Sequence, residues 1–403
     1  MWVTQATDRD LTLTGKYDGE RGELFRLAVV TALLTTVTLG LYRFWAKTRT
    51  RRYIWSSIGD GRDSLEYTGT GLEKLMGFLM AMVILAGYMG LVQMILFYFG
   101  INLFVDPETS EQAMMQLGAA SATVLAVVPL VFFAQYRARR YKMARTRWRG
   151  IRFGVDNGAW GYALRAMGHW VLTIMSLGLL LPWQTLRLER YIADRSWYGD
   201  APFQQGGNWT ALLPAMSHIY FGLLIALGGG AVAGAMGSLE TAGTIAVLGL
   251  VWFAIGVVIY RVKAFRYLTD NKVLDGNIWC EAEVVPANVV ATVLLGGLTV
   301  GIISTLIFVG LGAAVFFLVI PAMLLGEGAV FIAIVAIGAL YLLAFAVSGS
   351  LALVWVIQPV LTHVVGAISL HNADELDYIE QREPDSGADA EGFADALDIA
   401  GAV

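Results

Sequence analysis

The sequence predicts an all-α polytopic membrane protein. Its expected units are pseudo-repeats, each a re-entrant or bent helix followed by a transmembrane hairpin, with short cytoplasmic strand or turn connections. Of the 403 residues, 57% are hydrophobic and 15% are charged, whereas about a quarter of a typical soluble domain is charged. No charged residue lies between Val284 and Gly326, and only His363 and His371 ionise near neutral pH between Gly328 and Ala373. Each run exceeds the roughly 20 apolar residues of one bilayer crossing.

Four regions are expected along the chain. The first repeat unit is 1–153, with membrane segments at 24–41, 75–105 and 117–134; the second is 154–283, with segments at 162–181, 212–236 and 242–260; 284–373 is a degenerate third unit, and 374–403 is a tail. The tail holds ten acidic residues and one arginine, so its charge is −9 while the rest of the chain carries +5. Such a polar, acidic composition predicts disorder.

A self-comparison supports the repeat. Thr38-Leu39-Gly40 ends one apolar segment and Ser176-Leu177-Gly178 ends another, at an offset of 138 residues. A tryptophan and an Arg-Tyr pair follow each motif at the same spacings, as Trp45 and Trp183, and as residues 52–53 and 190–191. A fainter third copy, Thr299-Val300-Gly301, lacks both features.

The Arg-Tyr pair occurs four times, each time followed by a glycine and then by a large apolar residue twelve positions after the tyrosine. The pairs are 52–53, 140–141, 190–191 and 266–267; the glycines are Gly61, Gly150, Gly199 and Gly276; the apolar residues are Leu65, Phe153, Phe203 and Trp279. This spacing predicts a basic helix that leaves the membrane, a glycine turn and a short extended return.

The distribution of charge predicts the topology. The basic connections 43–74, 135–160, 182–211 and 261–283 are expected in the cytoplasm by the positive-inside rule. Two of these connections flank the single segment 162–181, so this segment and 24–41 are expected to enter and leave on one face. Suitable break points are Gly40, Gly178, Pro182 and Gly301. This interpretation gives six crossings with both termini cytoplasmic; eight or nine full crossings remain the alternative.

Motifs for catalysis or cofactor binding are not found in the sequence. No HExxH motif, Walker loop, G-x-S-x-G elbow or C-x-x-C pair occurs, and Cys280 is the single cysteine. The sequence therefore predicts no catalytic residue, no metal site and no cofactor. A cleavable signal peptide is not expected either, because the polar leader lacks a basic n-region.

Arginines of the basic connections are the candidate contacts for anionic lipids or for a partner protein. They are Arg49, Arg51, Arg52, Arg140, Arg145, Arg147, Arg149, Arg190 and Arg266. A basic residue beside an anionic membrane surface contributes about 1 kcal/mol of attraction. The competing interpretation is that these arginines only orient the chain. Nucleic acid is not an expected partner, since the basic runs are short and lie beside membrane segments.

Several motifs resemble the opening and the end of a known family. Glu23-Leu24-Phe25, Thr38-Leu39-Gly40-Leu41-Tyr42, Trp45 and the Arg-Tyr pair at 52–53 are similar to the start of the YjgN-like family of bacterial inner-membrane proteins, and residues 392–398 resemble its C-terminal signature. Phe44 departs from the family pattern, which has proline there. The resemblance implies an inner-membrane location and a possible membrane metalloprotease partner. The family is one of unknown function, so it supplies no catalytic residues.

The function expected from these features is that of a non-enzymatic membrane module that binds lipid or a partner protein. The alternative is a passive transporter or channel for a small neutral or anionic solute. That alternative predicts a water-accessible cavity lined by the re-entrant segments around Gly40 and Gly178.

Overall fold

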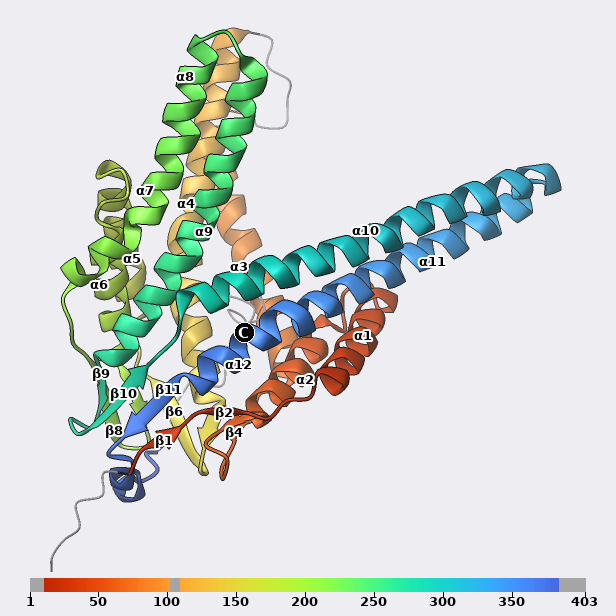
Figure 1. Cartoon of the computed structure of the whole chain (residues 1–403). Coiled ribbons are helices and arrows are strands. Elements are labelled where there is room, and N and C mark those ends of the chain that lie inside the picture. Colours follow the sequence, from red (N-terminus) through yellow and green to blue (C-terminus); the bar gives the residue numbers. More distant parts are fainter. Residues whose placement is uncertain (1–10, 102–108, 384–403) are drawn as a thin grey trace, which may run out of the picture. The chain divides into compact units, whose positions relative to one another are not determined.

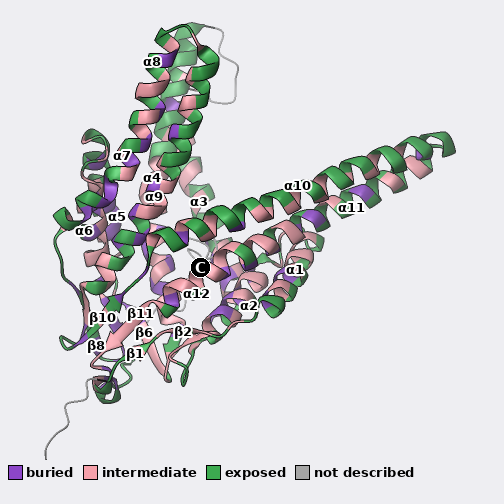
Figure 2. Ribbon diagram, viewed as in Figure 1, coloured by how far each residue is buried: buried purple, intermediate pink, exposed green. Residues whose placement is uncertain are grey.

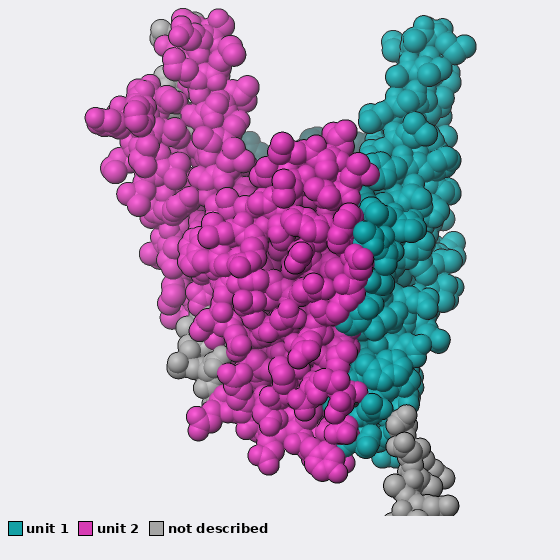
Figure 3. All heavy atoms as spheres, turned by 90° about the vertical axis from the view of Figure 1, so that its left-hand side faces the viewer, with its two compact units in different colours: residues 1–66, 210–271, 278–374 teal, residues 67–209, 272–277, 375–403 magenta. Residues whose placement is uncertain are grey.

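The computed structural model describes residues 11–101 and 109–383. The chain forms two compact units (Figures 1 and 3). Unit 1 comprises residues 1–66, 210–271 and 278–374, and unit 2 comprises residues 67–209, 272–277 and 375–403. The predicted disordered tail and the family signature at its end fall mostly on residues 384–403, outside the described residues.

Among the described residues, six helical stretches are long and apolar enough to cross a membrane, which agrees with the expected number. They are α3 (Gly71–Tyr98), α4 (Ser110–Ala144), η1 to α8 (Trp209–Ala235), α9 (Leu239–Asp270), α10 (Pro286–Leu325) and α11 to α12 (Glu327–Gly366). The third stretch contains η1 (Trp209–Met216), α7 (Ser217–Leu223), η2 (Leu224–Gly229) and α8 (Gly230–Ala235), and the sixth contains α11 (Glu327–Ala352), η3 (Leu353–Ile357) and α12 (Gln358–Gly366). Figure 2 shows how much of their surface is exposed, as lipid-facing helices require.

Side-chain caps explain where three of these spans begin. The hydroxyls of Thr70, Thr109 and Ser238 accept hydrogen bonds from backbone N–H groups three residues ahead, at 3.3, 3.2 and 3.4 Å. Such a cap satisfies one of the four N–H groups that a helix leaves without an internal partner.

Two shorter helical hairpins occupy the segments expected to re-enter the membrane. In unit 1, α1 (Arg21–Val37) and α2 (Arg43–Ser56) pack through Leu24 and Ile54 against Val354 of η3. In unit 2, α5 (Ala159–Met175) and α6 (Leu181–Ala193) pack through Tyr162, Ala166 and Ile192 against Tyr136 of α4.

The turns of the two hairpins have the same backbone. Leu39 and Gly40 have φ of +51° and +90°, and Leu177 and Gly178 have +52° and +88°. The Gly40 N–H donates to the Thr35 carbonyl at 2.7 Å, and the Gly178 N–H donates to the Thr173 carbonyl at 2.7 Å. Pro182 lies in the first turn of α6.

Each turn is also closed by a hydroxyl. Thr38 Oγ1 accepts from the Tyr42 N–H at 2.9 Å, and Ser176 Oγ accepts from the Leu180 N–H at 3.1 Å. Every one of these contacts recurs at the offset of 138, so the motif repeated in the sequence encodes one local structure.

The third expected break is wrong. Gly301 lies within α10, which continues without interruption for 40 residues. The long apolar run was interpreted as a re-entrant segment plus a crossing, whereas one helix of about 60 Å accommodates it. The third copy of the motif lacks the positive-φ turn of the first two.

The strands require a correction to the predicted fold class. Short strand connections were expected, but within each unit strands distant in the sequence pair into an antiparallel sheet, and β2 pairs with β3 in unit 1. The strands are β1 (Leu13–Thr14), β2 (Lys16–Tyr17), β3 (Ile58–Gly59), β4 (Leu65–Tyr67), β5 (Thr146–Trp148), β6 (Ile151–Val155), β7 (Ser196–Tyr198), β8 (Ala201–Gln205), β9 (Lys272–Leu274), β10 (Ile278–Ala282) and β11 (Ile368–His371). The last element described is η4 (Ala373–Tyr378).

Within each unit the strands are antiparallel. Unit 1 has the order β1-β11-β10, in which Leu370 of the central strand lies between Leu13 and Cys280. Unit 2 has the order β9-β8-β7-β6-β5, with Phe203 opposite Leu274 and Phe153 opposite Tyr198. The first strand, β1, therefore pairs with the last strand, β11.

The glycines of the Arg-Tyr motif lie in the turns, as predicted. Gly61, Gly150, Gly199 and Gly276 have φ of +86°, +79°, +59° and +76°. Glycine adopts this left-handed backbone without the steric cost that a Cβ would add. The large apolar residues that follow lie on the returning strands β4, β6, β8 and β10.

Candidate functional site

The Arg-Tyr motif proves to be structural at two of its copies. Arg140 Nε donates to the Val155 carbonyl at 2.8 Å, and Arg190 Nε donates to the Gln205 carbonyl at 2.9 Å. In both copies the acceptor lies 15 residues ahead, on the second strand of the following β-hairpin. These guanidinium groups therefore hold the end of a helix against a strand.

The tyrosine of the motif fastens a helical hairpin. Tyr53 Oη donates to the Glu20 carbonyl at 3.0 Å, and Tyr191 Oη donates to the Gly158 carbonyl at 2.9 Å. Glu20 and Gly158 are the N-cap residues of α1 and α5. Donor and acceptor both shift by 138 residues between the copies, which explains why the spacing is fixed.

The other predicted arginines fall into engaged and exposed groups. Arg145 pairs with Glu73 at 3.2 Å, Arg149 pairs with Asp377 at 3.6 Å, and Arg51 is buried beneath the Trp55 ring. Arg49, Arg52, Arg147 and Arg266 are exposed, although Arg49 lies 5.6 Å from the Tyr42 ring centre and Arg266 pairs with Asp270 at 3.8 Å. The structure thus does not bring the nine predicted arginines together into one site.

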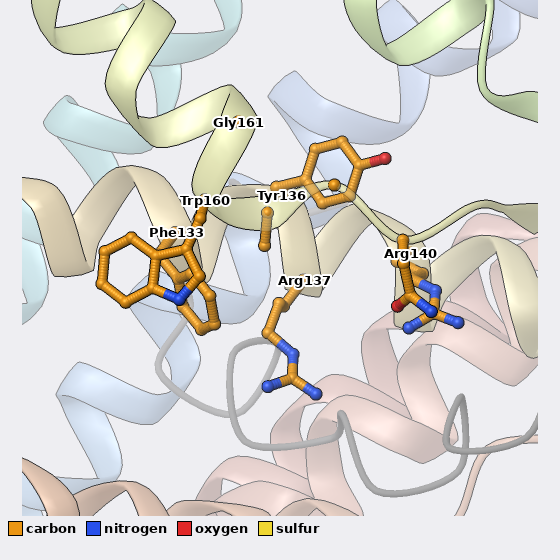
Figure 4. Close-up of a pocket in the computed structure, with 9 residues that line it drawn as sticks. Phe133, Tyr136, Arg137, Arg140, Trp160 and Gly161 are labelled. Carbon is orange, nitrogen blue, oxygen red and sulfur yellow. The ribbon is translucent and has the colours of Figure 1, made fainter.

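A pocket of about 320 Å³ lies in unit 2, where α4 passes the loop before α5 (Figure 4). Its lining residues are Phe133, Tyr136, Arg137, Arg140, Asn157, Gly158, Ala159, Trp160 and Gly161. Arg137 and Arg140 are three residues apart and so lie on one face of α4. Figure 4 shows the indole of Trp160 beside Phe133, and the guanidinium of Arg137 between this aromatic pair and Arg140.

Both the aromatic rings and the helix end make the pocket suitable for an anion. Arg137 lies over the Phe133 ring at 5.4 Å, and the Phe133 and Trp160 rings are 4.7 Å apart. The N-cap residue Gly158 has no side chain to cap α5, so the first N–H groups of that helix remain available. These N–H groups and the positive end of the helix dipole favour an anion beside the two guanidinium groups.

A half-buried ion-pair network joins α4, α6 and β9. Arg139 on α4 makes a two-pronged pair with Glu189 on α6, with both N···O distances 2.9 Å, and Lys272 on β9 donates to the same carboxylate at 2.9 Å. Burial alone would raise the pKa of Glu189, but Arg139 and Lys272 lower it to about 2. Three elements are thereby tied to one carboxylate that stays ionised.

Of the residues that line the pocket, the predicted contacts include only Arg140. Arg137 and Trp160 were not among the expected contacts, although the spacing of Arg137 and Arg140 was visible on a predicted helix. Trp160 carried no signal, because its position beside Phe133 depends on how the loop before α5 meets α4. Among the described residues, no three His, Cys, Asp or Glu side chains come together in a way that could hold a metal ion.

Comparisons with known proteins define the family. The chain is 25% identical over 149 residues to the inner membrane protein YjgN of Salmonella typhimurium, a match over 36% of this chain and 33% of that protein. It is 28% identical over 144 residues to YjgN of Escherichia coli K12, over 36% of this chain and 31% of that protein. The matched part thus spans about a third of these curated relatives, and no solved structure matches the chain. A family model described as bacterial protein of unknown function (DUF898) matches residues 12–396, so the chain belongs to this family of inner-membrane proteins.

Proposed function

We propose that this protein is a non-enzymatic membrane module that binds the headgroup of an anionic phospholipid in the pocket between α4 and α5. The observation that carries the proposal is the pairing of Arg137 and Arg140 with the uncapped start of α5 inside one pocket. Phosphate oxygens accept hydrogen bonds from guanidinium groups and from helix N-termini, so one phosphate satisfies both.

The position of the pocket along α4 favours a lipid as the source of that phosphate. The pocket lies in the last three turns of an apolar helix that is long enough to cross a membrane. Arginine and tryptophan are the side chains found at the level of lipid headgroups. Leu164 on α5 is exposed and offers apolar surface to an acyl chain.

In the same proposal, the turns of the two helical hairpins enter one leaflet of the bilayer. Leu39 and Leu177 are 97% and 85% exposed at the turns. Backbone groups in the hydrocarbon region need partners within the protein. The Thr38 and Ser176 hydroxyls and the bonds to Gly40 and Gly178 supply such partners. We therefore keep the re-entrant topology, with both copies entering and leaving on the cytoplasmic face, as part of the proposal.

The test is lipid retention by the full chain in nanodiscs of phosphatidylcholine containing phosphatidylglycerol. Arg137→Gln removes one charge from the pocket, and we expect about fivefold weaker retention of phosphatidylglycerol, the factor that one basic residue contributes. Arg140 is unsuitable for this test, because it also bonds the Val155 carbonyl. Native mass spectrometry after delipidation measures the retained lipid.

Two matched controls separate the pocket from general attraction to the membrane. Arg147→Gln and Arg266→Gln each remove an exposed arginine outside the pocket and should leave retention unchanged. Equal losses in all three variants would contradict the proposal and leave only diffuse surface electrostatics. Displacement of the lipid by inorganic phosphate with equal affinity would identify a soluble anion as the ligand.

The alternative functions have their own signatures. Flux of a small solute in liposomes that is blocked by substitutions near Gly40 or Gly178 would favour the passive transporter. A membrane protease that copurifies in stoichiometric amount would favour partner binding, as the family resemblance suggests.

A further inference from the structure

The last described residues form a strap on unit 2, and its contacts are specific. We define the C-terminal strap as residues 375–382. The Asp200 N–H donates to the Glu380 carbonyl at 2.9 Å, and the Glu380 N–H donates to Asp200 Oδ1 at 3.0 Å. The Arg152 N–H donates to Gln381 Oε1 at 2.9 Å. These bonds join the strap to the β5–β6 and β7–β8 hairpins.

Apolar burial fixes the strap further. Leu376 and Ile379 are 3% and 7% exposed. Gly199, at the turn of the β7–β8 hairpin, allows the close approach, because a Cβ there would lie 2.4 Å from the Glu380 carbonyl oxygen. A segment held by backbone bonds, two apolar side chains and a glycine contact is an integral part of unit 2.

The strap ends beside the pocket. Arg382 lies over the Trp197 ring at 5.0 Å, with its guanidinium 3.7 Å from Asp156 Oδ1. Asp156 directly precedes the pocket-lining loop that begins at Asn157, and its carbonyl accepts from Tyr136 Oη at 2.7 Å. The last anchored residue of the strap therefore contacts Asp156, whose chain neighbours are Asn157 of the pocket lining and Val155, the residue that Arg140 bonds.

The sequence beyond the strap has the charge that the pocket attracts. Residues 384–403 contain five carboxylates, of which Asp385 and Asp389 come first, and no lysine or arginine. We propose that this acidic tail is a tethered competitor, whose carboxylates occupy the basic pocket and oppose binding of a lipid phosphate there. The effect of the tail on lipid binding rests on the proposed function, whereas the contact between the tail and the pocket does not.

Tethering makes this competition effective without a strong contact. A segment joined to its binding site by a short flexible linker has an effective concentration in the millimolar range. A carboxylate also pairs with a guanidinium in the same two-pronged geometry as a phosphate does. A weak intramolecular ion pair is thus enough to compete with a lipid that is present in the bilayer.

The first experiment removes the tail. A chain that ends at Glu383 keeps the whole strap, and we expect it to retain phosphatidylglycerol about fivefold more tightly than the full chain in the same nanodiscs. The gain should shrink at 1 M salt, where the Debye length is about 3 Å. A full-length chain with Asp385→Asn, Asp389→Asn and Glu391→Gln should reproduce the gain. Unchanged retention in both variants would overturn the competition.

The second experiment detects the contact without lipid binding. Trp160→p-benzoyl-Phe places a photoreactive aromatic at the pocket of the full chain, and mass spectrometry identifies the peptide that is captured. We expect capture of a peptide from residues 384–403, with at least about threefold less capture when Arg137→Gln is added, in line with the loss of one charge contact. No capture of the tail, or equal capture after Arg137→Gln, would overturn the proposal. If no variant retains lipid but the tail is captured, then the proposed function fails and the tail contact stands.

Discussion

The hairpins α1–α2 and α5–α6 share a backbone but differ in what they present. Their turns, the hydroxyls that close them and the tyrosines that fasten them correspond at an offset of 138 residues. The apolar positions correspond as well, since Ile54 and Ile192 are both buried. Where the two copies agree, the shared residues form backbone contacts and packing.

The copies differ where charge is concerned. The first copy has Glu20 and Glu23 where the second has Gly158 and Gly161, so an acidic helix start corresponds to one without carboxylates at the pocket, and neither start has a side-chain cap. Glu189 of the second copy, which is half-buried, corresponds to the buried Arg51 of the first, so the sign of the charge is reversed at this position. The contrast indicates that the contacts shared by the two hairpins are structural, whereas the candidate site combines Arg140 of an Arg-Tyr motif with residues that differ between the hairpins.

The largest expected effect comes from the carboxylate that only the second copy has. Glu189→Gln leaves the half-buried Arg139 and Lys272 without their shared counter-ion, and we expect the free energy of unfolding to fall by about 2 kcal/mol, as for the loss of a hydrogen bond to a charged group. Unfolding in mixed micelles with a rising fraction of denaturing detergent measures the loss. Glu283→Gln is the matched control, since Glu283 is exposed, and it should change stability by less than about 0.5 kcal/mol.

The same carboxylate predicts a dependence on pH. Arg139 and Lys272 depress the pKa of Glu189 from 4.5 to about 2 despite its burial, so the stabilisation is complete above pH 4.5 and is lost as the pH falls towards 2. The difference in stability between wild type and Glu189→Gln should therefore narrow over this window. A difference that stays constant down to pH 2 would show that the network does not stabilise the fold.

An intermediate effect is expected at the turns that the two copies share. Gly40→Ala and Gly178→Ala force a Cβ into backbone with φ of +90° and +88°, and each should cost about 1–2 kcal/mol. Gly301→Ala is the control, because it lies in the interior of α10 with open space around it, where alanine is the better helix former. Unequal losses at the two turns would break the equivalence of the hairpins.

Most of the local structure, such as helix ends and turns, was predictable from the sequence. The Arg-Tyr motif marked the ends of helices, and the glycine after it marked each hairpin turn, because both signals lie within about 25 residues of chain. The sheet was not predictable in the same way. The strands are only two to five residues long, and pairing such as Phe153 with Tyr198 brings together elements far apart in sequence.

The candidate site was only partly predictable for the same reason. Arginines were expected to face lipid, but Arg140 and Arg190 turn towards carbonyl groups that only the folded β-hairpins provide. Arg137 becomes part of a pocket because the first turn of α5, which carries Trp160, lies beside α4. Composition identifies the charge of a segment, whereas its partners depend on contacts between elements.

The smallest expected effect concerns the tyrosine hydroxyls. Tyr191→Phe removes one hydrogen bond to the N-cap carbonyl of α5 and should cost about 1 kcal/mol. Tyr53→Phe should cost somewhat more, because Tyr53 Oη also accepts from the Glu20 N–H at 2.8 Å. Tyr98→Phe, at a residue that is 84% exposed, is the control and should be neutral. If both hydroxyls prove dispensable, then the fixed spacing of the motif reflects packing of the rings, and the hairpins are held by apolar contacts such as those of Ile54 and Ile192.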